Sequence, residues 1–411
     1  MPPARLQCAP VRSTSAAALA LIAAVGGGAL VLVVASSAGW LHSTTTKTVV
    51  VRAPAASSGD PSAPVVAAKP LLGNGFQPAQ IFRTRSAGVV TIISYFDAPA
   101  ASAGQGSGFV VSPDGLILTN AHVVTTAGQS TGGKTVPAST VYVEFSDGDR
   151  VTAMVVGVDL FDDVGLLRVD PTQHALDPVP LGDSSRVIVG EPVAAIGSPF
   201  GNADSLSVGV VSAIRRSIPS LTSNYDLVDA IQTDAPINHG NSGGPLFDAQ
   251  GRAIGINAQI RSSGAGSGFE GVGFAVPIDS ARRSMDQLLK TGGVRYAYVG
   301  IKTEDLTPAV AKKFGYAATR GALVDLVNPG SAAEKAGIKA GTRDEVYEGL
   351  GVKVGGDAIV AIDGIPVTGA QDVVRIVTTR LVPGETARFT VVRGSQRRVV
   401  SVTLDQRPPP G

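Results

Sequence analysis

The chain has 411 residues, of which 44% are hydrophobic and 16% charged, and its formal net charge is +1. This length predicts roughly two to three domains, and the ordinary apolar content argues against wholesale disorder. The small net charge gives no basic field for a nucleic-acid partner. The single Cys excludes an intrachain disulfide, and four His without a Cys/His cluster argue against a metal site. No cofactor is expected.

The N-terminal region predicts a membrane helix. Residues 13–46 carry no charged side chain, and residues 16–34 are almost wholly apolar. A helix over that apolar run rises about 28 Å, close to the hydrocarbon thickness of about 30 Å. Because Arg5 and Arg12 precede it, we expect residues 16–38 to be a signal anchor with the folded part outside the cytoplasm. A cleaved signal peptide is the alternative, with the same location for the folded part.

Residues 1–15, before the expected membrane helix, would be a short cytoplasmic segment. Composition divides the chain after that helix into three parts. Residues 39–75 are rich in Thr, Ala, Pro, Ser and Gly, which predicts a flexible linker. Residues 76–291 hold short apolar runs spaced about 8–12 residues apart, which predict an all-β unit of two packed small barrels. Residues 294–406 alternate such runs with two short helical segments, as expected for one small α+β domain.

Three residues in the predicted barrels suggest nucleophilic catalysis. Ser242 lies in the sequence GNSGGP, where glycines allow a tight turn and backbone N–H groups that converge on one point. His122 follows a predicted strand at the edge of the core, and an acid is expected before the buried run VGLLRV. Adjacent side chains on a strand face opposite sides, so either Asp162 or Asp163 faces this histidine. An ordinary Gly/Ser turn and a structural histidine are the alternatives.

The order of these motifs resembles the HtrA/Deg family of PDZ-containing serine proteases over about residues 76–405. The resemblance implies a mostly β fold, in which a chymotrypsin-like double β-barrel precedes one α+β PDZ domain. The motifs that carry it in the protease part are GSGFVV (106–111), LTNAHVV (118–124), DVGLLR (163–168), AIGSPFG (195–201), QTDA (232–235), GNSGGPL (240–246) and GFAVPI (273–278).

The resemblance also implies roles for individual residues. It favours Asp163 over Asp162 as the acid that orients His122, with His122 as the general base and Ser242 as the nucleophile. The oxyanion hole would be formed by the backbone N–H groups of Gly240 and Ser242, and Asn241 would shape the loop between them.

The specificity pocket is expected to be lined by four residues of the second barrel: Ile237, Asn257, Ala258 and Gln259. None of them is charged, so we expect small or medium apolar side chains before the cleaved bond. His239 stands where the family usually has Pro, either as a titrating neighbour of the oxyanion loop or as an exposed substitution.

The C-terminal part resembles a PDZ domain that takes C-terminal peptides on one loop and strand. The expected peptide-binding residues are Tyr298, Val299, Gly300 and Ile301, opposite a helix at 370–379. Residues 342–354 are longer than the usual turn at this place, which leaves the groove geometry open.

Taken together, the sequence predicts a membrane-anchored serine endopeptidase for unfolded or damaged extracytoplasmic proteins. A homotrimer formed around residues 76–82 is expected from the resemblance. A catalytically weak chaperone or peptide-binding sensor that keeps the protease fold is the alternative.

Overall fold

The computed structural model describes residues 75–97, 102–127, 135–197, 205–238, 240–258 and 271–410. All of them belong to one compact unit, Lys69–Gly411. The expected cytoplasmic segment, the expected membrane helix and nearly all of the expected linker lie outside the described residues. Within the described ranges, no helix has both the length and the apolar character needed to cross a membrane.

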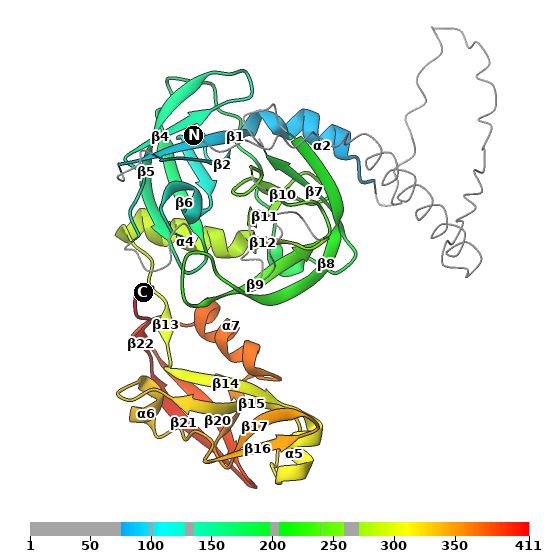
Figure 1. Cartoon of the computed structure of the whole chain (residues 1–411), viewed down its shortest axis with the longest axis vertical. Coiled ribbons are helices and arrows are strands. Elements are labelled where there is room, and N and C mark those ends of the chain that lie inside the picture. The colour runs from blue at the N-terminus through cyan, green and yellow to red at the C-terminus, as the bar shows by residue number, and fades with distance from the viewer. Residues whose placement is uncertain are drawn as a thin grey trace, which may run out of the picture. The chain divides into compact units, whose positions relative to one another are not determined.

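The first barrel closes six antiparallel strands in the order β1-β2-β3-β6-β5-β4 (Figure 1). Their inward positions are β-branched or aliphatic, as in β4, where Val141 and Val143 are buried and their neighbours are partly exposed. Closure leaves no free strand edge, so every strand is hydrogen-bonded on both sides. The strands are β1 (Val89–Phe96), β2 (Ser102–Val110), β3 (Leu116–Thr119), β4 (Thr140–Glu144), β5 (Arg150–Asp159) and β6 (Val164–Val169).

The second barrel also closes, in the order β10-β11-β12-β9-β8-β7. Both β7 and β11 are buried at every position, which agrees with their continuous apolar runs. The two closed barrels confirm the architecture that the strand spacing predicts. The strands are β7 (Pro192–Gly197), β8 (Ser205–Pro219), β9 (Asp226–Thr233), β10 (Pro245–Phe247), β11 (Ala253–Ala258) and β12 (Gly273–Pro277).

Two helices cover the barrels. Helix α2 (Pro78–Arg85) buries Ile81 in the same hydrophobic cluster as Phe76, and this cluster includes residues of both barrels. Helix α4 (Ile278–Thr291) follows β12 directly and buries Leu288 against β5. Gly157 in β5 permits this close approach, since a Cβ there would lie 2.7 Å from Leu288 Cδ2. Two single 3₁₀ turns, Ser86–Gly88 and Ser184–Arg186, complete this part.

The C-terminal domain packs helices against an antiparallel sheet ordered β14-β15-β18-β20-β21, with β19 beside β18. Its core contains the apolar side of α7 and Phe389 of β20. The elements are β13 (Ala297–Tyr298), β14 (Ile301–Leu306), α5 (Pro308–Phe314), β15 (Gly321–Val327), α6 (Ala332–Ala336), β18 (Ala358–Ile362), β19 (Ile365–Pro366), α7 (Ala370–Arg380), β20 (Thr386–Arg393), β21 (Gln396–Thr403) and β22 (Asp405–Gln406).

The long segment 342–354 forms a two-stranded hairpin of β16 (Arg343–Tyr347) and β17 (Leu350–Val354). Val352 and Val354 point inward and join the cluster around α5, so one face of the hairpin belongs to the core. The extra length therefore builds a β-hairpin attached to the domain.

A buried carboxylate directly before β18 pairs with an arginine of the neighbouring strand β20. Asp357 is fully buried, and its carboxylate accepts two hydrogen bonds from Arg393, from Nε at 2.8 Å and from Nη2 at 2.7 Å. The same carboxylate accepts the Lys339 N–H at 2.8 Å. A buried carboxylate that loses its cation is costly, so we expect this pair to matter for local stability.

Replacing Arg393 with Met should lower the free energy of local opening by about 2–3 kcal/mol, because the buried Asp357 carboxylate loses its cation. Hydrogen–deuterium exchange should then be faster in β18 and β20. Arg388→Met is the matched control, since Arg388 lies 3.9 Å from Asp363 and its side chain is 75% exposed. Equal exchange rates in β18 and β20 of both variants would contradict a stabilising role for the Asp357–Arg393 pair.

Candidate functional site

The turn between β5 and β6 carries the candidate acid in an unusual backbone conformation. Asp163 has φ of 52°, in the left-handed region that side chains other than Asn and Asp seldom adopt. Its carbonyl accepts a hydrogen bond of 2.9 Å from Asn120 Nδ2, and its carboxylate is buried. This conformation directs the Asp163 side chain toward the short helix α3 (Ala121–Val124).

His122 on α3 is held by both oxygens of the Asp163 carboxylate. Oδ2 lies 2.8 Å from His122 Nδ1, and Oδ1 accepts the backbone N–H of His122 at 3.0 Å. Burial by itself lowers the pKa of His122, but the charge of Asp163 and its hydrogen bond together outweigh burial. The net result is a pKa above the ordinary value of 6.5. Asp162 takes no part in these contacts, and its carboxyl lies beside Tyr296.

Ser242 lies in a turn that β2 and β11 hold from both sides. The Ser107 N–H donates to the Ser242 carbonyl at 2.8 Å, and the Gly243 N–H donates to the Asn257 carbonyl at 2.8 Å. Gly243 has φ of 87°, and a Cβ there would lie 2.1 Å from the Ser107 carbonyl oxygen. Glycine is therefore required immediately after the candidate nucleophile.

Helix α3 and the Ser242 turn flank the same point on β2. A Cβ on Gly106 would lie 2.6 Å from Val123 Cγ2 and 3.2 Å from the Ser242 carbonyl oxygen. Within the described residues, the Ser242 hydroxyl is buried and makes no hydrogen bond. In ligand-free sites, the hydrogen bond between a nucleophile and its base is often long or poorly aligned, and it tightens when substrate binds.

Asn241 closes the loop that precedes Ser242. Its Oδ1 accepts the Asn238 N–H at 2.9 Å, and its Nδ2 donates to the Pro236 carbonyl at 3.0 Å. The Gly240 carbonyl accepts a hydrogen bond from Ser107 Oγ at 2.5 Å, so it is held toward β2. Among the contacts between described residues, neither the Gly240 nor the Ser242 N–H has an acceptor.

The expected specificity residues fall partly within the described residues. Ile237 is 9% exposed and contacts the backbone at Gly273, while Ala258 is buried at the end of β11. Asn257 is fully buried, and its Nδ2 donates to the Pro245 carbonyl at 3.1 Å, so it supports the Ser242 turn. Gln259 and His239 lie outside the described residues.

The expected peptide-binding residues lie at the start of the outermost strand of the C-terminal sheet. Gly300, with φ of 79°, connects β13 to β14, and β14 pairs only with β15 in the described sheet. Val299 is buried and its carbonyl accepts the Ala333 N–H, whereas the Tyr298 hydroxyl accepts a hydrogen bond from Asn328. The free edge beginning at Ile301 could therefore add an extended peptide.

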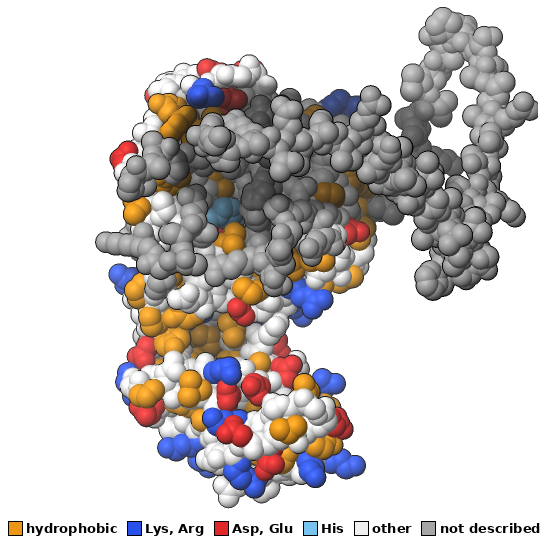
Figure 2. All heavy atoms as spheres, in the orientation of Figure 1, with side chains coloured by type: hydrophobic (Ala, Val, Ile, Leu, Met, Phe, Trp, Pro, Cys, Tyr) orange, Lys and Arg blue, Asp and Glu red, His pale blue; other side chains and the backbone are white. Residues whose placement is uncertain are grey.

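Surface charge gives this edge no evident preference for one sign. On the face drawn in Figure 2, acidic and basic side chains intermingle over the C-terminal domain. A peptide bound there would rely mainly on backbone hydrogen bonds and on an apolar contact at its last side chain.

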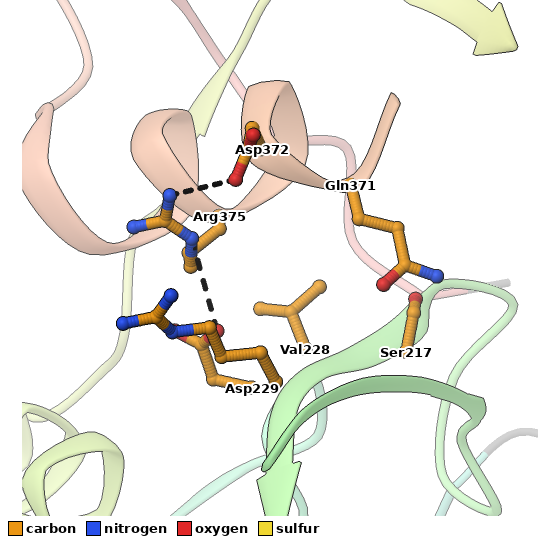
Figure 3. A pocket seen from close by; sticks show the side chains of 7 residues that line it. Ser217, Val228, Asp229, Gln371, Asp372 and Arg375 are labelled. Carbon is orange, nitrogen blue, oxygen red and sulfur yellow. Dashed lines mark hydrogen bonds and ion pairs between the residues drawn. The ribbon is translucent and has the colours of Figure 1, made fainter. Parts of the chain in front are cut away.

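Helix α7, beside this edge, also contacts the second barrel. Arg375 donates to Asp372 at 2.8 Å and forms an ion pair with Asp229 of β9 at 4.0 Å (Figure 3). Arg215, Ser217, Val228 and Gln371 complete the lining of a small pocket at this contact. The helix next to the candidate peptide edge is therefore linked to the barrel that carries Ser242.

Sequence reasoning assigned no role to several supporting residues. Ser107 and Thr119 connect β2 and β3 beneath the Ser242 turn, since Thr119 Oγ1 donates to the Ser107 carbonyl at 2.7 Å. Asn120 and Asp159 support the turn around Asp163. Three of the four lie in or next to the quoted motifs, but their partners are distant in sequence, so no local pattern could identify them.

Replacing Asp163 with Asn should lower the pKa of His122 below 6.5, because the negative charge is lost while burial of the imidazolium remains. NMR titration of the histidine Cε1–H signals measures this change. A His122 titration unaffected by the substitution would rule out Asp163 as its electrostatic partner.

The two domains match known families. Residues 106–256 match the trypsin-like peptidase domain, and residues 297–404 match the PDZ domain. "Protease Do-like 1, chloroplastic" of Arabidopsis thaliana is 40% identical over 74% of this chain and 64% of its own length. "Probable periplasmic serine endoprotease DegP-like" of Hahella chejuensis is 38% identical over 75% of this chain and 59% of its own length. The chain thus spans about three-fifths of these curated relatives.

Two solved structures are similar to this chain over nearly their whole length. "HtrA-type protease AlgW with tripeptide" has a TM-score of 0.66 and 30% identity, covering 81% of this chain and 98% of that one. The serine endoprotease from Yersinia pestis has a TM-score of 0.55 and 27% identity, covering 81% and 98%. The barrels, the PDZ domain and these similarities agree, and the chain therefore belongs to the HtrA/Deg family of PDZ-containing serine proteases.

Proposed function

We propose that this chain is a serine endopeptidase in which Ser242, His122 and Asp163 act together. The observation that carries the proposal is the Asp163 carboxylate, which lies 2.8 Å from His122 Nδ1 beside the Ser242 turn. This contact selects the tautomer in which Nε2 is free to accept a proton from the Ser242 hydroxyl.

The proposed reaction proceeds through an acyl-enzyme. Ser242 Oγ attacks the scissile carbonyl carbon, and its proton passes to His122 Nε2. The C–N bond then breaks, and the same proton goes to the leaving amine. Water, deprotonated by His122, attacks the acyl carbon. The bond between this carbon and Ser242 Oγ then breaks, and His122 returns the proton to Oγ, which releases the second product. The N–H groups of Gly240 and Ser242 would stabilise each oxyanion, each contributing about 3–4 kcal/mol.

We infer that the substrates are unfolded or damaged proteins outside the cytoplasm, and that C-terminal peptides bind the β14 edge. Relatives described as periplasmic endoproteases and structures of an HtrA-type protease with short peptides support this inference. The apolar run at residues 16–34 supports a single-pass membrane anchor. A trimer formed around residues 76–82 stays a prediction, and sizing chromatography tests it.

A second candidate function is a chaperone or peptide sensor with weak catalysis. The observation that favours it is the buried Ser242 hydroxyl, which makes no hydrogen bond within the described residues. In this case the domain would bind unfolded chains without cleaving them.

Casein incubated with the full chain should be degraded, and Ser242→Ala should reduce the rate by a factor on the order of 10⁴ or more. Binding of C-terminal peptides should persist in the variant, because Ser242 lies outside the PDZ domain. Gel electrophoresis measures the cleavage, and fluorescence anisotropy measures the peptide binding. Absence of cleavage by the unsubstituted chain, even with peptide present, would favour the second candidate.

A further inference from the structure

The turn that carries Asp163 begins with a second, fully engaged carboxylate. Asp159 is 1% exposed, and its Oδ1 accepts the backbone N–H of Phe161 at 2.9 Å and of Asp162 at 3.3 Å. Its Oδ2 accepts the hydroxyl of Ser284 on α4 at 2.7 Å. The backbone immediately before Asp163 is therefore shaped by one buried carboxylate.

The Tyr296 hydroxyl lies between this carboxylate and the next one along the chain. It is 2.5 Å from Asp159 Oδ2 and 2.9 Å from Asp162 Oδ2. A phenol has one proton and can donate it to only one of them. The other contact is a hydrogen bond only if that carboxyl is protonated and donates to the phenol oxygen. The geometry therefore requires one additional proton in this group of three residues.

The surroundings favour Asp162 as the protonated member. Burial first, and then the negative charge of Asp159, raise the pKa of Asp162 to about 7. The facing cations are Arg283 on α4, whose Nη2 lies 3.8 Å from Asp162 Oδ2, and Arg407 from the C-terminal segment. Burial raises the pKa of Asp159 as well, but the four hydrogen bonds that this carboxylate accepts act against that rise and favour its ionised form.

Arg407, directly after β22, holds Tyr296 in place. Its backbone N–H donates to the Tyr296 carbonyl at 2.8 Å, and its guanidinium lies 5.2 Å from the centre of the Tyr296 ring. The rings of Phe161 and Tyr225 enclose the same guanidinium at 5.3 and 5.0 Å. Arg407 Nη2 also donates to Thr378 on α7 at 2.8 Å. One arginine thus connects α7, the segment between α4 and β13, and the turn before Asp163.

We propose that Tyr296 is a positioning residue for the protease reaction: its hydroxyl, held by Arg407, joins a singly protonated Asp159–Asp162 pair and thereby fixes the turn from which Asp163 orients His122. Loss of the shared proton would leave two buried carboxylates competing for one phenol proton, and their repulsion would loosen that turn. The proposal rests on the proposed serine-protease function.

The first test compares Tyr296→Phe with Tyr225→Phe in the full chain. Both substitutions keep the ring around Arg407, but only the first removes a hydroxyl bonded to the carboxyl pair. With a chromogenic peptide substrate, Tyr296→Phe should lower kcat about tenfold to a hundredfold with little change in KM. The acid limb of its kcat/KM profile should also shift to lower pH, because a displaced Asp163 no longer raises the pKa of His122.

The control Tyr225→Phe should retain both kcat and the pH profile. Unchanged kcat and pH profile in Tyr296→Phe, in an unsubstituted chain that is active, would overturn the positioning role while leaving the protease function intact. An unsubstituted chain without activity would instead count against the proposed function. Thermal melts of each variant separate loss of positioning from loss of folding.

Asp162→Asn tests the shared proton by stability and needs no activity. A carboxyl whose pKa is raised on folding keeps a proton that the unfolded chain releases, so its contribution to stability decreases from about pH 4 to about pH 7. Asn does not titrate. The melting temperature of Asp162→Asn relative to the unsubstituted chain should therefore rise across this window and level off above it. A difference that is constant with pH would overturn the shared proton.

Discussion

The hydrogen bond between Asp163 and His122 depends on a backbone conformation that few residues tolerate. Asp163 adopts φ of 52° at the start of β6, and this places its carboxylate on both the ring and the backbone N–H of His122. A strained residue persists only where its neighbours hold it. Here the neighbours are the Asn120 amide and the Asp159 carboxylate, one from each side of the turn.

The same turn is where the two domains share hydrogen bonds. Tyr296, in the segment between α4 and β13, bonds both Asp159 and Asp162, and Arg407, directly after β22, donates its backbone N–H to the Tyr296 carbonyl. Helix α7 makes a separate contact with β9 through Arg375 and Asp229. A ligand that displaces α7 would therefore affect residues in contact with the turn that carries Asp163 and residues in contact with the second barrel. The closed barrels provide the rigid frame against which such small shifts have an effect.

Much of the architecture was predictable because it depends on local patterns. Short β-branched runs separated by turn residues predict strands, and most of the twelve strands that close into the two barrels coincide with such runs. The length of segment 342–354 does not by itself predict its structure, which is a hairpin because alternate residues Val352 and Val354 can be buried. The segment at Tyr298–Ile301 was predictable as a candidate peptide site from its resemblance to a PDZ domain, whereas the place of β14 at the end of the sheet order comes only from the structure.

By itself, the sequence determined the residue types and motifs: a serine between glycines, a histidine after a strand, and an acid before a buried run. The residues alone left Asp162 and Asp163 as alternatives, since adjacent positions differ only in the face that they present. Only the tertiary structure turns Asp163 toward His122 and Asp162 toward Tyr296. The physical reason is that these hydrogen bonds join residues far apart in sequence, as much as 137 positions for Asp159 and Tyr296. They can form only after the first barrel and the segment between α4 and β13 have come together.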